Sequence, residues 1–316
     1  MLASEITHKQ WEKKRGEVGF NAVFSNVNFI NTYSHSFSST PAFFQVVDVD
    51  KPCLLLAGFS KGRTLSFPTY YFFTPIWVNS DLSPILRNRA VETLLVFLKQ
   101  RYFTINLRLP LGFKDIRPFI WQGFTSTLKF TYVKSLSELT YHENIKRILK
   151  KGNSDYSVKV IPWTTEIEQF LPAELIHIQF RKSKVPSIVS SLKELCNLDL
   201  MVVFAGYYKD KLVACDLVLK DMNELKAYMF FISKSYGHYK SGFPAMMYDY
   251  VFKYFQEKGV NEVDMFGANI PEIALYKSKF TPELVDFFEV RYSFKRNIVE
   301  KNFKRVKSLI RRILHL

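Results

Sequence analysis

The second half of the chain shows the clearest alternation of apolar and polar positions. Three apolar runs, Met201–Tyr207, Lys211–Leu219 and Leu225–Ser233, are separated by short polar turns, which predicts an antiparallel meander. A helix is expected over Pro244–Lys258, because proline favours the first turn of a helix and a glycine follows the last residue. A strand over Asn261–Phe266 comes next. This order predicts a mixed sheet with helices packed on its faces.

Further elements of the second half surround that sheet. Two capping-box patterns, Ser135–Glu138 and Thr165–Glu168, each predict the start of a helix. The expected elements are helices from Ser135 to Lys151, from Thr165 to about Phe180, over Pro186–Cys196 and over Pro271–Lys279, and strands over Tyr156–Ile161 and Leu284–Phe294.

The first half repeats much of this order, with a strongly amphipathic helix after its own meander. Its expected elements are a short strand Phe20–Phe24, a helix Asn26–Phe37, meander strands Ala42–Val49, Cys53–Ser60 and Thr64–Phe73, a helix Pro84–Arg101, a strand Thr104–Leu109, a short helix Asp115–Trp121 and an extended segment Phe130–Val133.

The repeat is also visible in individual residues. Ile105–Leu109 is matched about 156 positions later by Asn261–Met265, and the same offset aligns Phe124 with Phe280. We therefore predict two related domains, with chance similarity between two α/β halves as the alternative. The predicted parts are a first domain over residues 1–134, a second over 135–296 and a tail over 297–316.

Composition narrows the class of protein. The chain has 316 residues, 47% of them hydrophobic, so it can bury a large core. Lysine and arginine outnumber acidic residues 44 to 29, and the charge of +15 favours anionic partners such as nucleotide cofactors, RNA or acidic lipids; a protein that is simply basic is the alternative. The scattered cysteines and histidines suggest neither a disulfide framework nor a metal site. With no secretory signal and no apolar run of membrane-spanning length, a cytoplasmic location is expected.

Two segments resemble a known group of proteins. Asp115–Phe124, followed by Phe130–Tyr132, and Phe266–Pro271, followed by Leu275–Phe280, are similar to the ends of the two domains in tandem GNAT proteins. That group includes the Fem-type aminoacyltransferases of peptidoglycan bridge formation and related GNAT-type acyltransferases. The resemblance implies an α/β (α+β) fold of two tandem GNAT-like domains with mixed central sheets.

The resemblance also implies a place for a cofactor. In GNAT enzymes, backbone N–H groups at a helix start hold the pyrophosphate of coenzyme A, because the positive end of a helix attracts anions. That loop corresponds to residues 235–243, and Pro244 after it removes one N–H donor. A strand-to-helix turn without a ligand is the alternative. The implied cofactor-binding residues are Tyr239, Lys240, Ser241, Gly242, Phe243 and Asn269.

Tyr276 is the strongest catalytic candidate. Asn269, Tyr276 and Phe280 resemble a GNAT element whose tyrosine hydroxyl protonates the leaving thiolate, with Lys277 where that element has an acid. The alternative is an aromatic ring that packs the short helix on the sheet. The first-domain counterpart is Ile120, which cannot transfer a proton, so the second domain is expected to be the active one.

Weaker candidates complete the site. His238 could act as a base toward an amine, because histidine side chains in general have a pKa near neutrality. Asp264 ends a strand, where it could face the substrate. The alternatives are a solvated histidine, a polar strand end and, for Arg117, an ion pair with Asp115. The candidates for substrate binding are Arg117, Trp121 and Tyr236.

The tail over residues 297–316 has its own pattern. Apolar positions recur at helical spacing and basic residues cover much of the rest, which predicts a basic amphipathic helix. Such a helix could lie on an anionic membrane or contact RNA phosphates. The alternative is a helix packed on the body of the protein with its charges solvated.

The residues and the resemblance together predict an N-acyltransferase. It would move an acyl group from an acyl thioester, with acyl-CoA as donor and no metal, to an amine on a small molecule or on a cell-envelope precursor, which could be lipid-linked. One alternative is a Fem-type transferase that uses aminoacyl-tRNA as donor. The other is a catalytically silent binding protein that kept the fold. The protein is expected in the cytoplasm or at the inner face of the membrane.

Overall fold

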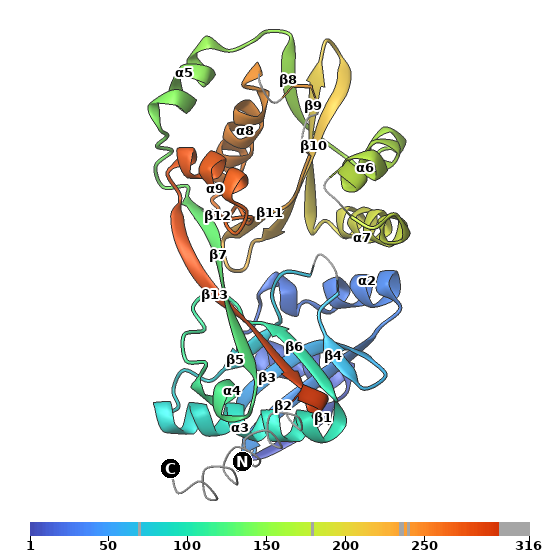
Figure 1. Ribbon diagram of the computed structural model, residues 1–316, viewed down its shortest axis with the longest axis vertical. Helices are drawn as coiled ribbons and strands as arrows, with labels where there is room; N and C mark the ends of the chain where they lie inside the picture. The colour runs from blue at the N-terminus through green and yellow to red at the C-terminus, as the bar shows by residue number, and fades with distance from the viewer. Residues whose placement is uncertain (69–70, 178–179, 234–236, 239–240, 297–316) are drawn as a thin grey trace, which may run out of the picture. The chain divides into compact units, whose positions relative to one another are not determined.

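The structure is a computed structural model of the 316-residue chain, in which the chain divides by its internal contacts into two compact units (Figure 1). The contacts group residues 21–38 with residues 129–286, and residues 287–296 with residues 1–20 and 39–128. The described residues are 1–68, 71–177, 180–233, 237–238 and 241–296. Of these, unit 1 comprises 1–20, 39–128 and 287–296, and unit 2 comprises 21–38 and 129–286.

Unit 1 is built on a sheet with the strand order β1, β2, β3, β4, β6, β13, and with β5 paired to β3. The predicted antiparallel pairing of the first two meander strands, β2 and β3, is confirmed. The third ends at Ser66 rather than at Phe73. The elements are β1 (Leu2–Ile6), α1 (His8–Glu17), β2 (Thr40–Asp48), β3 (Lys51–Lys61), β4 (Thr64–Ser66), β5 (Ile76–Val78), α3 (Pro84–Arg101), β6 (Thr104–Arg108), α4 (Arg117–Trp121) and part of β13 (Glu283–Ser293).

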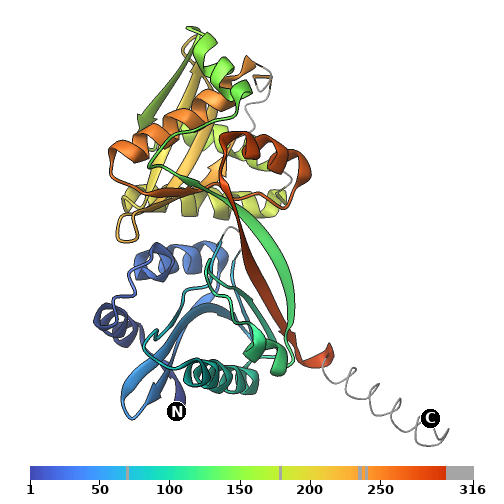
Figure 2. The same ribbon diagram turned by 90° about the vertical axis from the view of Figure 1, so that its left-hand side faces the viewer.

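Helices α1 and α3 cover opposite faces of this sheet, as Figure 2 shows. Phe43 and Phe44 are adjacent in β2, so their side chains point to opposite faces. Trp11 of α1 packs on Phe43 with ring centroids 5.2 Å apart, and Phe97 of α3 packs on Phe44 at 6.3 Å. The predicted helix α3 is confirmed over its full expected length.

The strands of unit 2 pair in the order β7, β12, β11, β10, β9, β8. The predicted antiparallel meander is β9–β10–β11, and β11 pairs with β12 in parallel across the connecting helix α8, as expected. The elements are η1 (Val23–Ser25), α2 (Val27–Phe37), part of β7 (Thr125–Ser135), α5 (Glu143–Lys151), β8 (Tyr156–Ile161), α6 (Thr165–His177), η2 (Lys182–Lys184), α7 (Val185–Asn197), β9 (Met201–Tyr208), β10 (Lys211–Asp221), β11 (Lys226–Ile232), α8 (Phe243–Glu257), β12 (Glu262–Asp264), α9 (Pro271–Lys277) and η4 (Ser278–Phe280).

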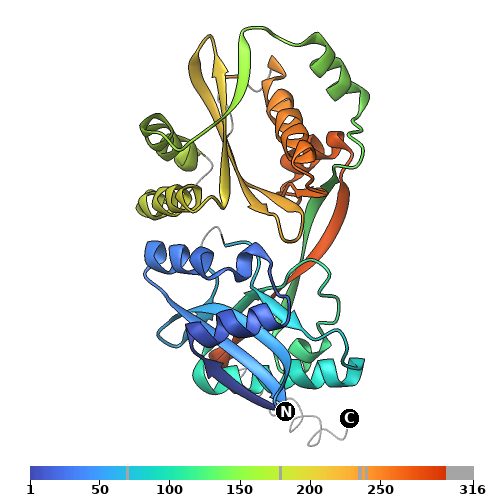
Figure 3. The same ribbon diagram turned by 180° about the vertical axis from the view of Figure 1, so that it is seen from behind.

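Helices cover both faces of the unit 2 sheet. Figures 1 and 3 show α5 and α8 on one face and α6 and α7 on the other. Helix α2 joins α7, although it comes from the first half of the chain. Phe29 and Tyr33 of α2 pack edge-on against Phe230 of β11, both with centroids 6.4 Å away. This helix therefore completes the core of unit 2.

The last strand of each half pairs inside the other unit. The end of β7 pairs with β12, with Val133 opposite Asp264, in unit 2. The end of β13 pairs with β6, with Glu289 opposite Arg108, in unit 1. Each unit therefore completes its sheet with a strand from the other half of the chain.

Two local predictions were wrong. Ser135 does not start a helix: it is the last residue of β7, opposite Glu262, and α5 begins only after the cap residue His142. Hydrogen bonding in the sheet outweighs the local capping pattern there. Phe20–Phe24 forms no strand, because its last residues begin a 3-10 turn whose Val23 N–H donates to Asp221.

Candidate functional site

Strands β11 and β12 separate in the middle of unit 2. Their parallel pairing runs from Lys226–Glu262 to Tyr228–Asp264 and stops there, while β11 continues to Ile232. Phe230 is an extra residue in β11, because the register against β10 shifts around it. We call the point where the two strands part the fork of unit 2.

Three buried charged side chains lie around this fork, and we call them the fork cluster. Asp264 ends β12 and is 4% exposed, Asp216 of β10 is 2% exposed, and Lys277 of α9 is 6% exposed. One oxygen of Asp216 accepts a hydrogen bond from Ser233 N–H at 3.1 Å. One oxygen of Asp264 accepts hydrogen bonds from the Thr131 hydroxyl and from a backbone N–H.

The second oxygen of each carboxyl group is buried without a partner. Neither Oδ2 of Asp216 nor Oδ2 of Asp264 has a hydrogen-bond partner in the described structure. A buried polar atom without a partner costs free energy, and such atoms concentrate where a ligand or a reaction uses them.

Lys277 is fixed by backbone carbonyl groups. Its ammonium group donates hydrogen bonds to the carbonyl oxygens of Met265 and Phe266, the latter at 3.0 Å. The chain passes Lys277 at Gly267, where φ is +71° and an added Cβ atom would lie 3.1 Å from Nζ. Glycine tolerates that backbone conformation, so it permits the close approach. One of the three ammonium protons remains beyond these two bonds.

Burial shifts the pKa values of the three side chains in the fork cluster toward neutral pH. It raises the pKa of Asp216 to about 8 and that of Asp264 to about 6, and the charge of Lys277 opposes both shifts. Burial lowers the pKa of Lys277 to about 8, and the two carboxylates oppose that change. Groups that titrate near neutral pH can exchange protons with a bound substrate.

Tyr276 precedes Lys277 on α9, beside the cluster. Its ring packs edge-on against Phe280 and Tyr248, with ring centroids 5.6 Å and 6.0 Å away. The ring therefore has packing contacts of the kind expected in the alternative interpretation. Burial, and then the charge of Asp216, raise the pKa of the Tyr276 hydroxyl above its usual value. The hydroxyl therefore stays protonated at neutral pH. Its role as a proton donor stays a prediction.

The start of α8 has little free capacity for a pyrophosphate. The N–H of Phe243 donates to the Ser241 hydroxyl at 3.3 Å, Pro244 has no N–H, and Ala245 N–H donates to the carbonyl of Gly242 at 3.0 Å. Gly242 has φ of +84°, and an added Cβ atom would lie 2.5 Å from Ile148. These contacts make Gly242 necessary for the turn itself.

Other predicted loop residues are held by neighbouring aromatic rings. His238 Nδ1 lies 2.9 Å from the hydroxyl of Tyr156. Phe243 is fully buried and stacks on the same tyrosine at 4.6 Å, inside the core of unit 2. Among the described residues, no hydrogen bond or ring contact joins His238 to the fork cluster. Tyr236, Tyr239 and Lys240 lie outside the described residues.

Asn269 and Arg117 already have partners within the protein. The Asn269 side chain accepts a hydrogen bond from Phe130 N–H at 2.9 Å and donates one to its carbonyl at 2.7 Å. Both guanidinium bonds of Arg117 go to Asp115, at 2.9 and 2.7 Å, which is the ion pair expected as the alternative. Trp121 of α4 is 59% exposed in unit 1. Binding roles for these residues stay predictions.

Comparison with known proteins identifies the fold. Neither a known protein family nor a curated protein sequence matches the chain. FemX matches 95% of this chain and 99% of its own, with a TM-score of 0.63 and 10% sequence identity. The C-terminal domain of a lysylphosphatidylglycerol synthetase from Agrobacterium fabrum matches 95% and 97%, with a TM-score of 0.59 and 9% identity. A tandem GNAT protein from the clavulanic acid biosynthesis pathway matches 91% of this chain and 97% of its own, with a TM-score of 0.54 and 13% sequence identity. The chain has a tandem GNAT-like fold, as predicted.

In this fold the fork of unit 1 is the counterpart of the fork of unit 2. Strands β4 and β6 pair in parallel only at Thr64–Thr104 and Leu65–Ile105. Beyond these pairs, Thr74 bonds to β6 in place of β4. Its N–H donates to the carbonyl of Arg108 at 2.8 Å, and its hydroxyl accepts a hydrogen bond from Arg108 N–H at 3.0 Å. The Arg108 guanidinium pairs with Glu289 at 2.6 Å. The polar groups of Arg108 are therefore satisfied by the protein, whereas Oδ1 of Asn106, also on β6, is buried without a hydrogen-bond partner.

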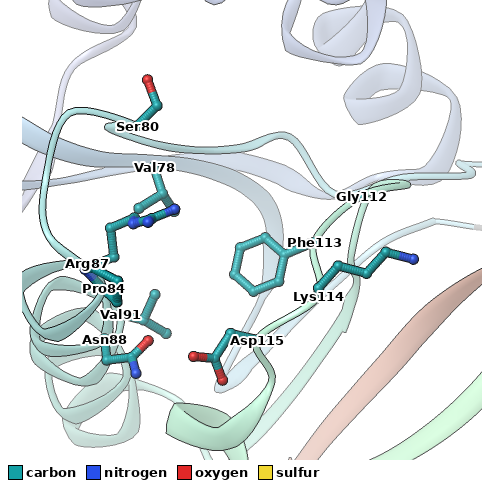
Figure 4. A pocket seen from close by; sticks show the side chains of 10 residues that line it. All are labelled: Val78, Ser80, Pro84, Arg87, Asn88, Val91, Gly112, Phe113, Lys114 and Asp115. Carbon is teal, nitrogen blue, oxygen red and sulfur yellow. The ribbon is translucent and has the colours of Figure 1, made fainter.

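Unit 1 also has a cavity of about 290 Å³ at the start of α3. Figure 4 shows Arg87 and Asn88 of α3 on one side, facing Phe113 and Asp115 on the other. The neighbouring Arg117 lowers the pKa of Asp115 to about 2, chiefly through their hydrogen bond. The carboxylate that lines this cavity is therefore already neutralised by the protein.

Sequence reasoning missed two members of the fork cluster. Asp216 interrupts the apolar run Leu212–Leu219, and a charge within a buried strand was the signal that could have found it. Lys277 was noted only as a departure from the resembled motif. Among the described residues there is no group of three histidine, cysteine or acidic side chains able to hold a metal ion, and no helix long and apolar enough to cross a membrane.

Proposed function

We propose that the protein is a GNAT-type transferase that moves an acyl or aminoacyl group to an amine, with its reaction centre at the fork of unit 2. The observation that carries this proposal is the pair of buried, unpartnered carboxyl oxygens of Asp216 and Asp264 beside the buried Lys277. These groups lie at the fork, where the parallel pairing of β11 with β12 ends. The fold supports the same reaction class, because the matched structures include a tandem GNAT protein.

Asp264, Lys277 and Tyr276 each have a role in this reaction. Asp264, with its pKa raised to about 6, accepts the proton that the amine loses as it attacks the acyl carbon. The remaining proton of the Lys277 ammonium stabilises the oxyanion of the tetrahedral intermediate. Tyr276 then donates its hydroxyl proton to the leaving group, and the C–O or C–S bond breaks.

Two donor classes fit this chemistry, and one observation separates them. Coenzyme A requires a place for its pyrophosphate, and the first N–H groups of α8 are bonded within the protein or absent. An aminoacyl ester on tRNA needs no such cradle, and a net charge of +15 suits a polyanionic carrier. We therefore place aminoacyl-tRNA ahead of acyl-CoA as donor.

The acceptor follows from the same comparison. The name lysylphosphatidylglycerol synthetase denotes a lysyl group joined to a phospholipid, and the resemblance to Fem-type enzymes implies a peptidoglycan precursor. Both are lipid-linked components of the cell envelope, so we propose an acceptor of that class at the inner face of the membrane. The tail over residues 297–316, which is predicted to be a basic amphipathic helix, lies outside the described residues.

A donor-consumption assay tests the proposal. Purified protein is mixed with a cell-envelope lipid extract and with either aminoacylated tRNA or acetyl-CoA, and loss of donor is followed with and without the extract. We expect acceptor-dependent loss of aminoacyl-tRNA. That loss should disappear in Lys277→Met, whose ammonium group is gone, and persist in Lys279→Met, whose side chain is exposed two positions away. If no donor is consumed, the silent binding protein is the correct alternative.

A further inference from the structure

Helix α5 carries a basic face that the reaction at the fork does not use. Lys146 pairs with exposed Glu143 at 2.7 Å, and Arg147 donates to Asn144 at 2.7 Å. Lys150 and Lys151 are exposed and have no ion pair in the described part of the chain. Residues three and four apart on a helix are neighbours, so these four cations form one continuous surface. We call Lys146, Arg147, Lys150 and Lys151 the basic face of α5.

The apolar residues of α5 are turned away from that face. Ile145 is buried, and Ile148 and Leu149 pack against the hydrophobic core of unit 2. The basic face therefore offers no large apolar side chain that could enter a lipid layer, as amphipathic membrane helices do. Its chemistry fits a solvated polyanion. A convex helix surface can contact such a chain at several charges, whereas a small anion is usually held in a concave site.

The position of α5 connects this surface to the proposed reaction centre. At its N-terminal end, His142 N–H donates to the carbonyl of Lys279 at 2.9 Å, two residues after Lys277. Further along, Ile148 packs against Gly242 at the start of α8. The helix therefore runs from the segment that carries Tyr276 and Lys277 to the loop before α8.

We infer that the basic face of α5 binds the sugar–phosphate backbone of the RNA that carries the donor ester. This inference deepens the proposed function and rests on it. Phosphate contacts supply affinity and set the position of an RNA without reading its sequence. Docking along α5 brings one end of the bound strand to the segment that contains Tyr276. The donor ester then reaches the fork from the side of α9.

The test is RNA binding by full-length protein with matched charge reversals. Unacylated bulk tRNA is titrated by fluorescence anisotropy over a range of salt concentrations. The variant Arg147→Glu/Lys150→Glu/Lys151→Glu should bind at least about 10-fold more weakly. Its slope of log binding constant against log salt concentration should be shallower by about three. The control Lys9→Glu/Lys61→Glu/Arg89→Glu changes three exposed cations of unit 1 and has the same net charge. It should retain most of the affinity and the wild-type slope.

A milder variant guards against loss of the helix. Acidic residues in the last turn of a helix oppose its dipole, so Arg147→Gln/Lys150→Gln/Lys151→Gln is measured in parallel, with circular dichroism as the folding check. It should also weaken RNA binding. Equal losses in the α5 and control variants, or unchanged binding in folded α5 variants, would overturn the inference.

The remaining outcomes separate this inference from the function. If the α5 variants lose binding to phosphatidylglycerol vesicles but keep tRNA binding, the face contacts membranes and the inference is wrong. Lys277→Met should keep tRNA binding, because Lys277 is buried and is not part of the basic face. If donor consumption depends on Lys277 while tRNA binding ignores α5, the function stands and the RNA surface does not.

Discussion

The two units place opposite chemistry at the same point of the fold. At the fork of unit 1, Arg108 is paired with Glu289, and Thr74 satisfies its backbone groups. At the fork of unit 2, the position matched to Arg108 by the sequence repeat is Asp264, a buried carboxyl group with one unpartnered oxygen. In the fork of unit 1 the charged side chain is paired within the protein, whereas in the fork of unit 2 two buried carboxyl groups each keep an oxygen without a partner, at a cost in stability.

This difference indicates how a repeated fold divides its tasks. A polar group that the protein has already satisfied has little to offer a substrate. A buried group whose partner is missing gains free energy when a substrate supplies that partner. Ile120 stands in the first domain where the second has Tyr276, which predicts the second domain to be the active one. The buried carboxyl groups at the fork of unit 2 favour the same domain on independent physical grounds.

The largest expected effect separates the two forks by activity. Lys277→Met removes the cation from the fork of unit 2 and should lower turnover by about 1000-fold, the upper range for loss of an oxyanion donor. Arg108→Met makes the matching change in unit 1 and should leave turnover unchanged. The measurement is donor consumption by both variants, with folding checked by thermal melts. Equal losses in the two variants would contradict the division of tasks.

A smaller effect is expected at the hydroxyl beside the cluster. Tyr276→Phe removes the proposed proton donor and should lower turnover by about 100-fold. Its thermal stability should stay at the wild-type value, because the described structure gives the hydroxyl no hydrogen-bond partner and the ring contacts persist. Tyr254→Phe on α8 serves as the control. Wild-type turnover in folded Tyr276→Phe would leave Tyr276 with its packing role alone.

The pH dependence of stability distinguishes the two units, because the pKa of Asp216 in unit 2 is raised and that of Asp115 in unit 1 is lowered. Burial raises the folded pKa of Asp216 from 3.8 to about 8, so its contribution to stability is complete below pH 3.8 and is lost as the pH rises through about 8. The wild type should therefore lose at least about 1 kcal/mol of unfolding free energy relative to Asp216→Asn between pH 5 and 8. Urea denaturation at both pH values measures it. Lys277, Glu174 and Tyr276 interact electrostatically with this carboxyl group. The pH dependence is therefore divided among these groups and does not belong to Asp216 alone.

Unit 1 supplies the control for that measurement. Arg117 lowers the pKa of Asp115 to about 2, so the contribution of Asp115 is present above pH 3.8 and is lost only as the pH falls through about 2. The difference between wild type and Asp115→Asn should therefore be constant from pH 5 to 8. A constant difference for Asp216→Asn as well would mean that Asp216 is solvated in solution.

The smallest effect is expected at the ion pair of unit 1. Arg108 and Glu289 are 23% and 30% exposed, and partly exposed pairs of this kind contribute at most about 1 kcal/mol. Glu289→Gln should lower the unfolding free energy by no more than that and leave donor consumption intact. Thermal melts and the donor assay measure both. A loss of activity would show that the fork of unit 1 takes part in the reaction.

The sequence by itself determined the local elements and the class of fold. The helix Pro84–Arg101, the meander from Met201 onward and the parallel crossover through α8 follow from hydrophobic period and from punctuation by proline and glycine. The motif around Tyr276 lies in the same unit as the buried cluster. These features depend on neighbours in the sequence, which is why a single sequence displays them.

Only the tertiary structure decided which segments pair and which charges lose their solvent. Hydrophobic alternation marks β7 as a strand without naming its partner, so the pairing of its end with β12 and the failure of the Ser135 helix became visible only in the fold. The same limit applies to the site. Asn269 matched a cofactor motif and is bonded to Phe130, whereas Asp216 lies about 60 residues from Lys277 and its proton affinity depends on burial. Sheet pairing and desolvation arise from contacts distant in the chain, and a local pattern cannot encode them.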